Sequence, residues 1–152
     1  IYLSIFLQFS YGNDIFNGSR LFLESLQGGD NQTTDVLRRW KKPGDITDIP
    51  RATLESVAAD NKRVSSRFIE DGSYLRIKNV TLGYSFNKEL LERVHVSSLR
   101  LYVSAQNLFT FTKYSGLDPE VNYGGNDTYQ VGTDFFTFPQ ARSLTVGLNL
   151  KF

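Results

Sequence analysis

The sequence SLTVGLNLKF at residues 143–152 decides the fold class, because apolar and polar residues alternate through it without a break. One set of alternate positions is entirely apolar: Leu144, Val146, Leu148, Leu150 and Phe152. The other set consists of Ser143, Thr145, Gly147, Asn149 and Lys151. A period of two residues indicates a β-strand with one apolar and one polar face.

Three further segments show this alternation, which predicts an all-β chain with antiparallel strands at residues 1–11, 73–86, 98–112 and 141–152. In the second of these strands the apolar positions change from odd to even near Asn79. One extra residue, forming a β-bulge, would reset the phase. Alternatively, the upper part of the strand projects beyond the apolar band.

The connections between these strands are long, short and long: residues 12–72, 87–97 and 113–140. The first contains two stretches that suit a helical turn, at residues 21–26 and 35–40. Outer-membrane barrels have short periplasmic turns and long extracellular loops. We therefore expect 87–97 to be a periplasmic turn, and 12–72 and 113–140 to be extracellular loops.

Composition excludes several classes of protein. The chain of 152 residues has a formal charge of +1 and no cysteine, which argues against nucleic-acid binding by bulk charge and excludes thiolate sites and disulfides. Its longest apolar runs have three residues, whereas a transmembrane helix needs about 20. The single histidine, His95, has no evident partner for catalysis or metal binding, so no enzyme, metal or cofactor is expected.

Strand length and aromatic placement favour a membrane barrel over a soluble carbohydrate-binding β-sandwich, which remains the alternative because alternation is common to both. The regular strands are longer than the five or six residues typical of globular strands, and about 9–11 residues cross a bilayer. Aromatic residues gather toward the strand ends, as in interfacial girdles. They are Phe9, Tyr11, Phe109, Phe111, Tyr114 and Phe138 at one level, and Tyr84, Phe86 and Phe152 at the other.

Five stretches of the sequence form a recognisable series: RFIEDGSYLRIKNVTLGY at 67–84, RLYVSAQNLFT at 100–110, YSGLDPEV at 114–121, PQAR at 139–142, and the segment from Arg39-Trp40 to Arg51. Together they resemble SusC/RagA-type TonB-linked (TonB-dependent) transporters. The resemblance implies an antiparallel transmembrane β-barrel fragment, the last four strands of a 22-stranded barrel. It does not extend to the plug domain or TonB box. Because residue 1 is Ile and methionine is absent, the chain is interpreted as part of a longer protein.

The resemblance also implies function and partners. It implies import of oligosaccharides or peptides across the outer membrane of a Gram-negative bacterium, with a SusD-like surface lipoprotein above the barrel. Energy would come from TonB through the missing N-terminal part, and outer-membrane lipid would surround the barrel. Thr145, Gly147, Leu150 and Phe152 match the insertion signal of outer-membrane barrels, which the barrel-assembly machinery would recognise by strand pairing. Nucleic acid is not an expected partner.

Two further sets of site residues follow from position. Opposition to the apolar face predicts these lumen-facing residues: Arg100, Ser104, Gln106, Thr145, Asn149 and Lys151. Loop aromatics that could contact a ligand or partner are Trp40, Tyr123, Tyr129, Phe135 and Phe136. Oxygen ligands for calcium could come from Asp118, Glu120, Asn122, Asn126 and Asp127, but their spacing does not match a calcium loop, and turn formation is the favoured interpretation.

Overall fold

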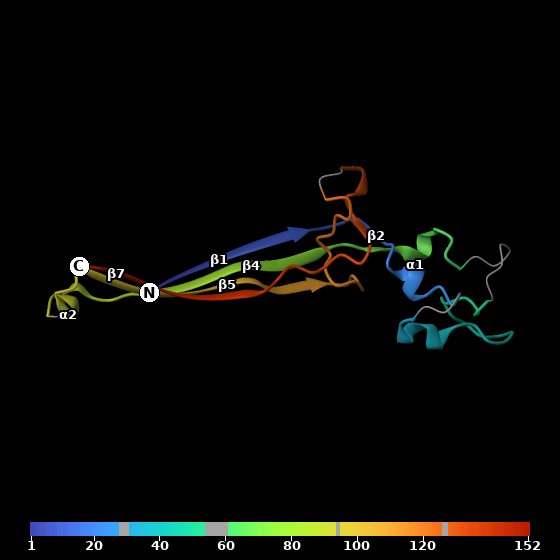
Figure 1. The fold of residues 1–152 in the computed structure, drawn as a ribbon, viewed down its shortest axis with the longest axis horizontal. Helices are drawn as coiled ribbons and strands as arrows, with labels where there is room; N and C mark the ends of the chain where they lie inside the picture. Colours follow the sequence, from blue (N-terminus) through green and yellow to red (C-terminus); the bar gives the residue numbers. More distant parts are fainter. Residues whose placement is uncertain (28–30, 54–60, 94, 126–127) are drawn as a thin grey trace. The chain divides into compact units, whose positions relative to one another are not determined.

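The computed structural model describes residues 1–27, 31–53, 61–93, 95–125 and 128–152. They form two compact units, both visible in Figure 1. The strand unit consists of Ile1–Tyr11, Ser73–Lys113 and Pro139–Phe152. The loop unit consists of Gly12–Gly72 and Tyr114–Phe138. Each is described here by itself.

The strand unit contains a four-stranded antiparallel sheet in the order β1-β4-β5-β7, drawn as long arrows in Figure 1. The strands are β1 (Tyr2–Ser10), β4 (Tyr74–Ser85), β5 (Ser98–Thr112) and β7 (Ser143–Lys151). The expected antiparallel all-β class is therefore confirmed. Between β4 and β5 the chain forms a short helix, α2 (Lys88–Glu92), which buries Leu91. Five residues are too few to show a helical period in the sequence, so only a turn was expected there.

Cross-strand partners in this sheet match in polarity. Val103 pairs with Val146, and the adjacent Ser104 pairs with Thr145. Because residues directly opposite each other point to the same side of a sheet, one face is apolar and the other polar. The apolar face is open: Val146 is 72% exposed and Leu148 is 59% exposed. The sheet therefore presents apolar side chains along its length without burying them in a core of its own.

The change of phase in β4 is a β-bulge. Phe6 and Leu7 are consecutive in β1, but they pair with Asn79 and Ile77 of β4. Lys78 is thus one residue more than β1 requires, and the alternation changes parity at this point. The bulge was one of the two explanations that the sequence left open.

The irregularity is larger in the next strand. Gln106 pairs with Asn79 and Phe109 with Ile77, so residues 107–108 of β5 lie opposite one residue of β4. Asn107 has a positive φ of 49°, a conformation that asparagine tolerates better than most residues. Its Nδ2 donates to the carbonyl of Ala141 at 3.0 Å. β5 thus has one residue more than β4 and two more than β1, and an even number of extra residues leaves its parity unchanged, so Phe109 and Phe111 continue the apolar odd positions.

A row of alternating tyrosine and glycine crosses the polar face. Tyr2 pairs with Gly83, Gly83 with Tyr102, and Tyr102 with Gly147. A Cβ on Gly83 would overlap the Tyr2 ring, and one on Gly147 would overlap the Tyr102 ring. The guanidinium of Arg100 lies over the Tyr2 ring, 4.3 Å from its centroid, and donates to the Tyr2 hydroxyl. Both glycines are therefore required by ring packing.

The loop unit has its own small sheet in the order β3-β2-β6. Its strands are β2 (Asp14–Asn17), β3 (Ile69–Asp71) and β6 (Thr133–Asp134), with β2 antiparallel to β3 and parallel to β6. The short helices are α1 (Arg20–Leu23), η1 (Thr34–Arg38), η2 (Ser66–Phe68) and η3 (Thr128–Gln130). The segments expected as two separate loops thus fold together.

The core of the described residues lies mainly in the loop unit. Apart from Leu91 of α2, the buried hydrophobic side chains belong to it: Ile15, Val36, Ile49, Phe68, Tyr114 and Val121. Ile15 contacts Tyr114 and Val121, which joins residues from both long connections. Within the described ranges, no helix has both the length and the apolar character needed to span a membrane.

Candidate functional site

The six residues predicted to face the lumen lie on the polar face of the four-stranded sheet. Arg100 pairs with Asn149, and Ser104 pairs with Thr145. The Ser104 hydroxyl lies 2.9 Å from the Thr81 hydroxyl, within hydrogen-bond distance. Gln106 accepts a hydrogen bond from the Ser143 hydroxyl at 3.4 Å, and Lys151 pairs with Ser98. The structure brings these side chains to one surface, and their orientation toward a lumen remains a prediction.

Two pairs of the expected girdle aromatics pack together in the strand unit, whereas Tyr114 and Phe138 belong to the loop unit. Phe109 and Phe111 pack with ring centroids 4.8 Å apart, and so do Tyr84 and Phe86. Tyr114, expected in the same girdle as Phe109, is instead buried in the loop unit. Its hydroxyl donates to Oδ2 of Asp134 at 2.6 Å. Burial is the main cause that raises the pKa of Tyr114 well above its usual range, and the hydrogen bond to the Asp134 carboxylate raises it further. The expectation for Tyr114 was wrong because the chain leaves the sheet after Lys113.

Three of the five candidate loop aromatics form one cluster. The ring centroids of Tyr123 and Phe135 are 5.2 Å apart, and those of Phe135 and Phe136 are 5.3 Å apart. Phe22 of α1 completes the cluster at 5.4 Å from Phe135, and its proximity had no signal in the local sequence. Phe136 is half-exposed with a positive φ of 54°, and its N–H donates to the Ser19 hydroxyl at 2.7 Å.

The other two candidate aromatics lie on different segments of the loop unit. Trp40 follows η1, and its backbone N–H donates to the Ile49 carbonyl at 3.0 Å. Tyr129 belongs to η3 and is 95% exposed. Their contact with a ligand or a partner remains a prediction.

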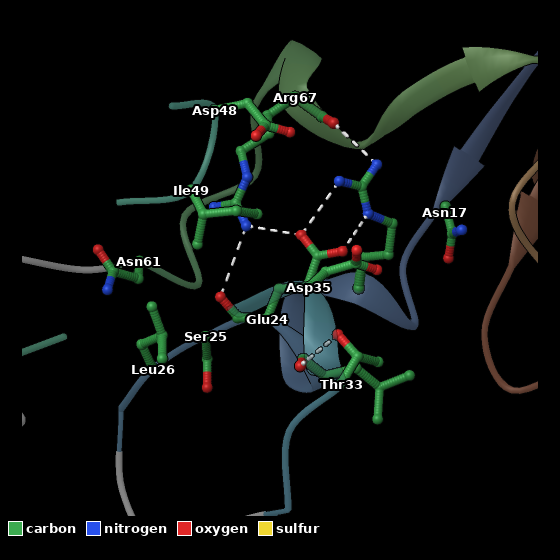
Figure 2. A network of polar contacts seen from close by, with 12 residues as sticks. Asn17, Glu24, Ser25, Leu26, Thr33, Asp35, Asp48, Ile49, Asn61 and Arg67 are labelled. Atoms are coloured by element: carbon green, nitrogen blue, oxygen red, sulfur yellow. Dashed lines mark hydrogen bonds and ion pairs between the residues drawn. The ribbon is translucent and has the colours of Figure 1, made fainter. Parts of the chain in front are cut away.

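A network of ion pairs, unforeseen in the sequence, holds the loop unit together. Glu24 lies between two guanidinium groups: Arg20 Nε is 2.7 Å from Glu24 Oε1, and Arg67 Nη2 is 2.8 Å from Glu24 Oε2. Figure 2 shows the contact between Glu24 and Arg67. Arg20 also pairs with Glu70 at 2.9 Å. The Glu24 side chain is only 4% exposed, so these charges are shielded from water. The hydrogen bond to Glu24 is the main cause that raises the pKa of Arg20.

Glu70 extends the network to the second long connection. Its carboxylate accepts hydrogen bonds from the Ser115 N–H and the Ser115 hydroxyl, both at 2.9 Å. Asn17 Nδ2 donates to the same carboxylate at 3.1 Å. Burial would raise the pKa of Glu70, but the bonds from Ser115, Arg20 and Asn17 together lower it. The contact pairs residues 45 positions apart, so sequence spacing had no bearing on it.

The proposed insertion-signal residues lie on the edge strand β7 and at its end. Thr145 pairs with Ser104 and Leu150 with Leu99, while Gly147 lies under the Tyr102 ring. Phe152 follows β7 and is 82% exposed. The packing of the Tyr102 ring explains why position 147 is a glycine, independently of any recognition by the assembly machinery. The role of these residues in insertion remains a prediction.

The carboxylate and histidine side chains of the described ranges do not gather into a metal centre. These ranges contain no group of three or more His, Cys, Asp or Glu side chains placed to hold a metal ion. Of the calcium candidates, Asp118 accepts the Glu120 N–H at 2.9 Å, a turn contact, while Asn126 and Asp127 lie outside the described residues. His95 is exposed beyond α2.

Comparison with known proteins places this chain beside TonB-dependent receptors. No family model matches the chain. It is 40% identical over 154 residues to the TonB-dependent receptor P3 of Formosa agariphila, covering 99% of this chain and 15% of that protein. It is 38% identical over 90 residues to the TonB-dependent receptor SusC of Bacteroides thetaiotaomicron, covering 59% of this chain and 8% of that protein.

Solved structures agree with these relatives. The closed-closed state of the RagAB peptide importer matches with a TM-score of 0.79 and 25% identity, over 99% of this chain and 15% of that one. A structure of the RagAB peptide transporter matches with a TM-score of 0.76 and 26% identity, over 99% of this chain and 16% of that one. The chain thus spans about 15% of the length of the proteins it matches over nearly all its residues.

Proposed function

Because this chain belongs to the SusC/RagA type of TonB-dependent receptors, we propose that the protein containing it is an outer-membrane transporter that imports oligosaccharides or peptides. The chain would supply the last four strands of a closed barrel, which would have 22 strands. TonB would act through a part of the protein outside this chain. The RagAB structures that match this chain are of a peptide importer, and this likeness supports peptides as one class of substrate for the protein that contains the chain.

The open apolar face of the strand unit is the observation that carries this proposal. On β7, Leu144, Val146 and Leu148 are 71%, 72% and 59% exposed. A continuous apolar face of this kind needs an apolar neighbour, and lipid supplies one. In a closed barrel, the outer edge of β1 and the outer edge of β7 would each pair with a strand from outside this chain, because closure leaves no strand edge unpaired in the bilayer.

A soluble β-sandwich explains the same face less well. It would require a second sheet long enough to cover strands of 9 to 15 residues. The strands of the loop-unit sheet have four, three and two residues. Such short strands cannot bury the length of β5, which favours a lipid neighbour over a protein one.

The proposal also assigns roles to the polar face of the sheet, to α2, to the loop unit and to the edge of β7. The polar face, including Arg100, Ser104 and Asn149, would line the lumen, and α2 would lie at the periplasmic end. The loop unit would be extracellular, with its aromatic cluster toward the substrate or a SusD-like lipoprotein. The barrel-assembly machinery would read Thr145, Gly147, Leu150 and Phe152 at the edge of β7.

Deletion and complementation in the source bacterium test the proposal. The strain lacking the full-length gene should lose uptake of some fluorescently labelled oligosaccharide or peptide, and the full-length gene should restore it. A protonophore should abolish the restored uptake, because TonB draws on the inner-membrane proton gradient. Recovery of the full-length protein in the soluble fraction, or uptake that the deletion leaves unchanged, would refute the proposal.

A further inference from the structure

The apolar face of the strand unit changes from aromatic to basic at its loop-side end, where β1 and β5 end and the chain continues into the loop unit. Leu75 of β4 pairs with Phe9 of β1 and with Phe111 of β5, so these three residues form a row across the face. Phe9 is 75% exposed and Phe111 is 53% exposed. Two positions further along β1 and β5, the same alternation places Tyr11 and Lys113 on this face, and both are exposed. An aromatic row followed by a hydroxyl and an ammonium is typical of the boundary between lipid and water.

A second basic residue extends the same face on β7. Ser143 pairs with Gln106 on the polar face, so alternation places the preceding residue, Arg142, on the apolar side with Leu144. Arg142 is exposed. Lys113 lies about six residues further along β5 than the level of Arg142, or about 20 Å at roughly 3.3 Å per residue. The two cations would therefore contact separate anionic groups, with the long Arg142 side chain extending towards the interface.

Of the two ends of the apolar face, only the loop-side end carries basic side chains within the described ranges. Arg100 and Lys151 lie at the opposite end, but they pair with Asn149 and Ser98 on the polar face. The residues on the apolar face at that end are uncharged: Tyr84, Leu99, Leu101, Leu148 and Leu150. The positive charge of this face is therefore one-sided.

The strand unit has no acidic side chain that could neutralise the loop-side end. Its acidic residues are Glu89 and Glu92, and both belong to α2. α2 precedes β5, whereas Lys113 follows the last residue of this 15-residue strand. The ion pairs of the described residues join arginines to carboxylates within the loop unit instead. The charges of Lys113 and Arg142 are thus left to a negative neighbour from outside the strand unit.

We propose that Lys113 and Arg142 bind the phosphate groups of lipids in the outer leaflet of the outer membrane. This inference rests on the proposed function, because the end of the apolar face meets headgroups only if the face itself meets lipid. Lysine and arginine both bind phosphate through charge-assisted hydrogen bonds. Basic residues at one edge of a membrane-facing surface attract anionic lipids of the adjacent leaflet. A soluble anionic partner would not explain why the cations continue the apolar face beyond an aromatic row.

Lipid binding can be measured directly on the delipidated full-length protein in detergent, by native mass spectrometry. The probe is diphosphoryl lipid A. The matched control lipid is the same lipid A after removal of both phosphates, which keeps the sugar and the acyl chains. We expect the phosphorylated lipid to bind at least about tenfold more tightly, since the charge-assisted contacts require its phosphates.

Three variants and one control assign this binding to the two cations. Lys113→Gln and Arg142→Gln should each weaken lipid A binding about fivefold, and the double variant about 25-fold. Lys113→Arg keeps the charge and should retain most of the binding. Lys88→Gln removes a charge from an exposed position of α2, beyond the opposite end of β5, and should leave binding unchanged.

Equal binding of lipid A with and without its phosphates would overturn the proposal, and so would unchanged binding by the double variant. Competition by inorganic phosphate at millimolar concentration would show that the cations take a soluble anion, which overturns the lipid assignment as well. Import does not require a preferred headgroup. A negative result for a full-length protein that is still recovered in the outer membrane and restores uptake therefore refutes only this inference, whereas a soluble protein would refute the proposed function.

Discussion

Replacing Leu148 by arginine tests the lipid-facing assignment of the apolar face. Leu148 is one residue from Gly147, the centre of the nine-residue β7, and is therefore about 3 Å along the strand from its midpoint. Arginine on the lipid face near the midplane of a bilayer costs about 2–4 kcal/mol. That cost corresponds to a change of roughly 30- to 900-fold in the folding equilibrium.

A soluble sheet would respond differently to the same change. Leu148 is 59% exposed, and a substitution at an exposed site away from special features usually changes stability by no more than about 0.5 kcal/mol. Thr145→Arg is the matched control, because Thr145 lies at a similar depth on the polar face and pairs with the uncharged Ser104. Asn149 is less suitable, since it pairs with Arg100 and a second arginine there would add repulsion.

The assay is chemical unfolding of the full-length protein in lipid vesicles, with the folded fraction read from its heat-modifiable gel mobility. We expect Leu148→Arg to lose about 2–4 kcal/mol and Thr145→Arg to lose less than about 1 kcal/mol. Equal losses at the two positions, or a larger loss at Thr145, would show that the apolar face does not meet lipid.

Three further predictions concern packing, pH and assembly. Gly147→Ala should destabilise the full-length protein by about 1–3 kcal/mol, measured by the same unfolding assay, and the loss should shrink when Tyr102 is also alanine. The pKa of Glu70 is lower in the folded state than in the unfolded chain, so ionised Glu70 stabilises the fold. This contribution to the free energy of unfolding is complete above the unfolded-state pKa of about 4.3 and is lost as the pH falls through the lower folded-state pKa. Hydrogen exchange in the loop unit should therefore accelerate in that acidic range, and Glu70→Gln should remove this dependence. Deleting Phe152 should lower the outer-membrane yield far more than the melting temperature of the recovered protein, because the ring is 82% exposed and buries little area; normal yield with a lower melting temperature would make it a packing residue.

The ion-pair network gives the loop unit a stability that does not depend on a large apolar core. Removing one partner of a buried pair leaves an uncompensated charge, which commonly costs about 3–5 kcal/mol. Glu24 binds two arginines, and Glu70 binds a third segment through Ser115. Both long connections are therefore held in one unit by the same few carboxylates.

The alternation of apolar and polar residues by itself determined the strands and their faces. In β7, Leu144, Val146 and Leu148 share a face because side chains in a strand alternate with a period of two, a property of the local backbone. The same rule revealed the break of phase near Asn79. It could not assign the cause, because a bulge is defined by pairing with neighbouring strands, and the register shift beside Lys78 appears only when β1 and β4 lie together.

Tertiary structure alone decided the interior of the loop unit. Glu70 meets Ser115 across 45 residues, Phe22 joins the aromatic cluster from another segment, and Tyr114 lies in a core rather than in a girdle. None of these contacts has a sequence period, since each depends on how two long connections fold against each other. Ion pairs and ring contacts are short-range in space and long-range in sequence. Local alternation therefore determines the strands, whereas these loop contacts arise only when the chain is folded.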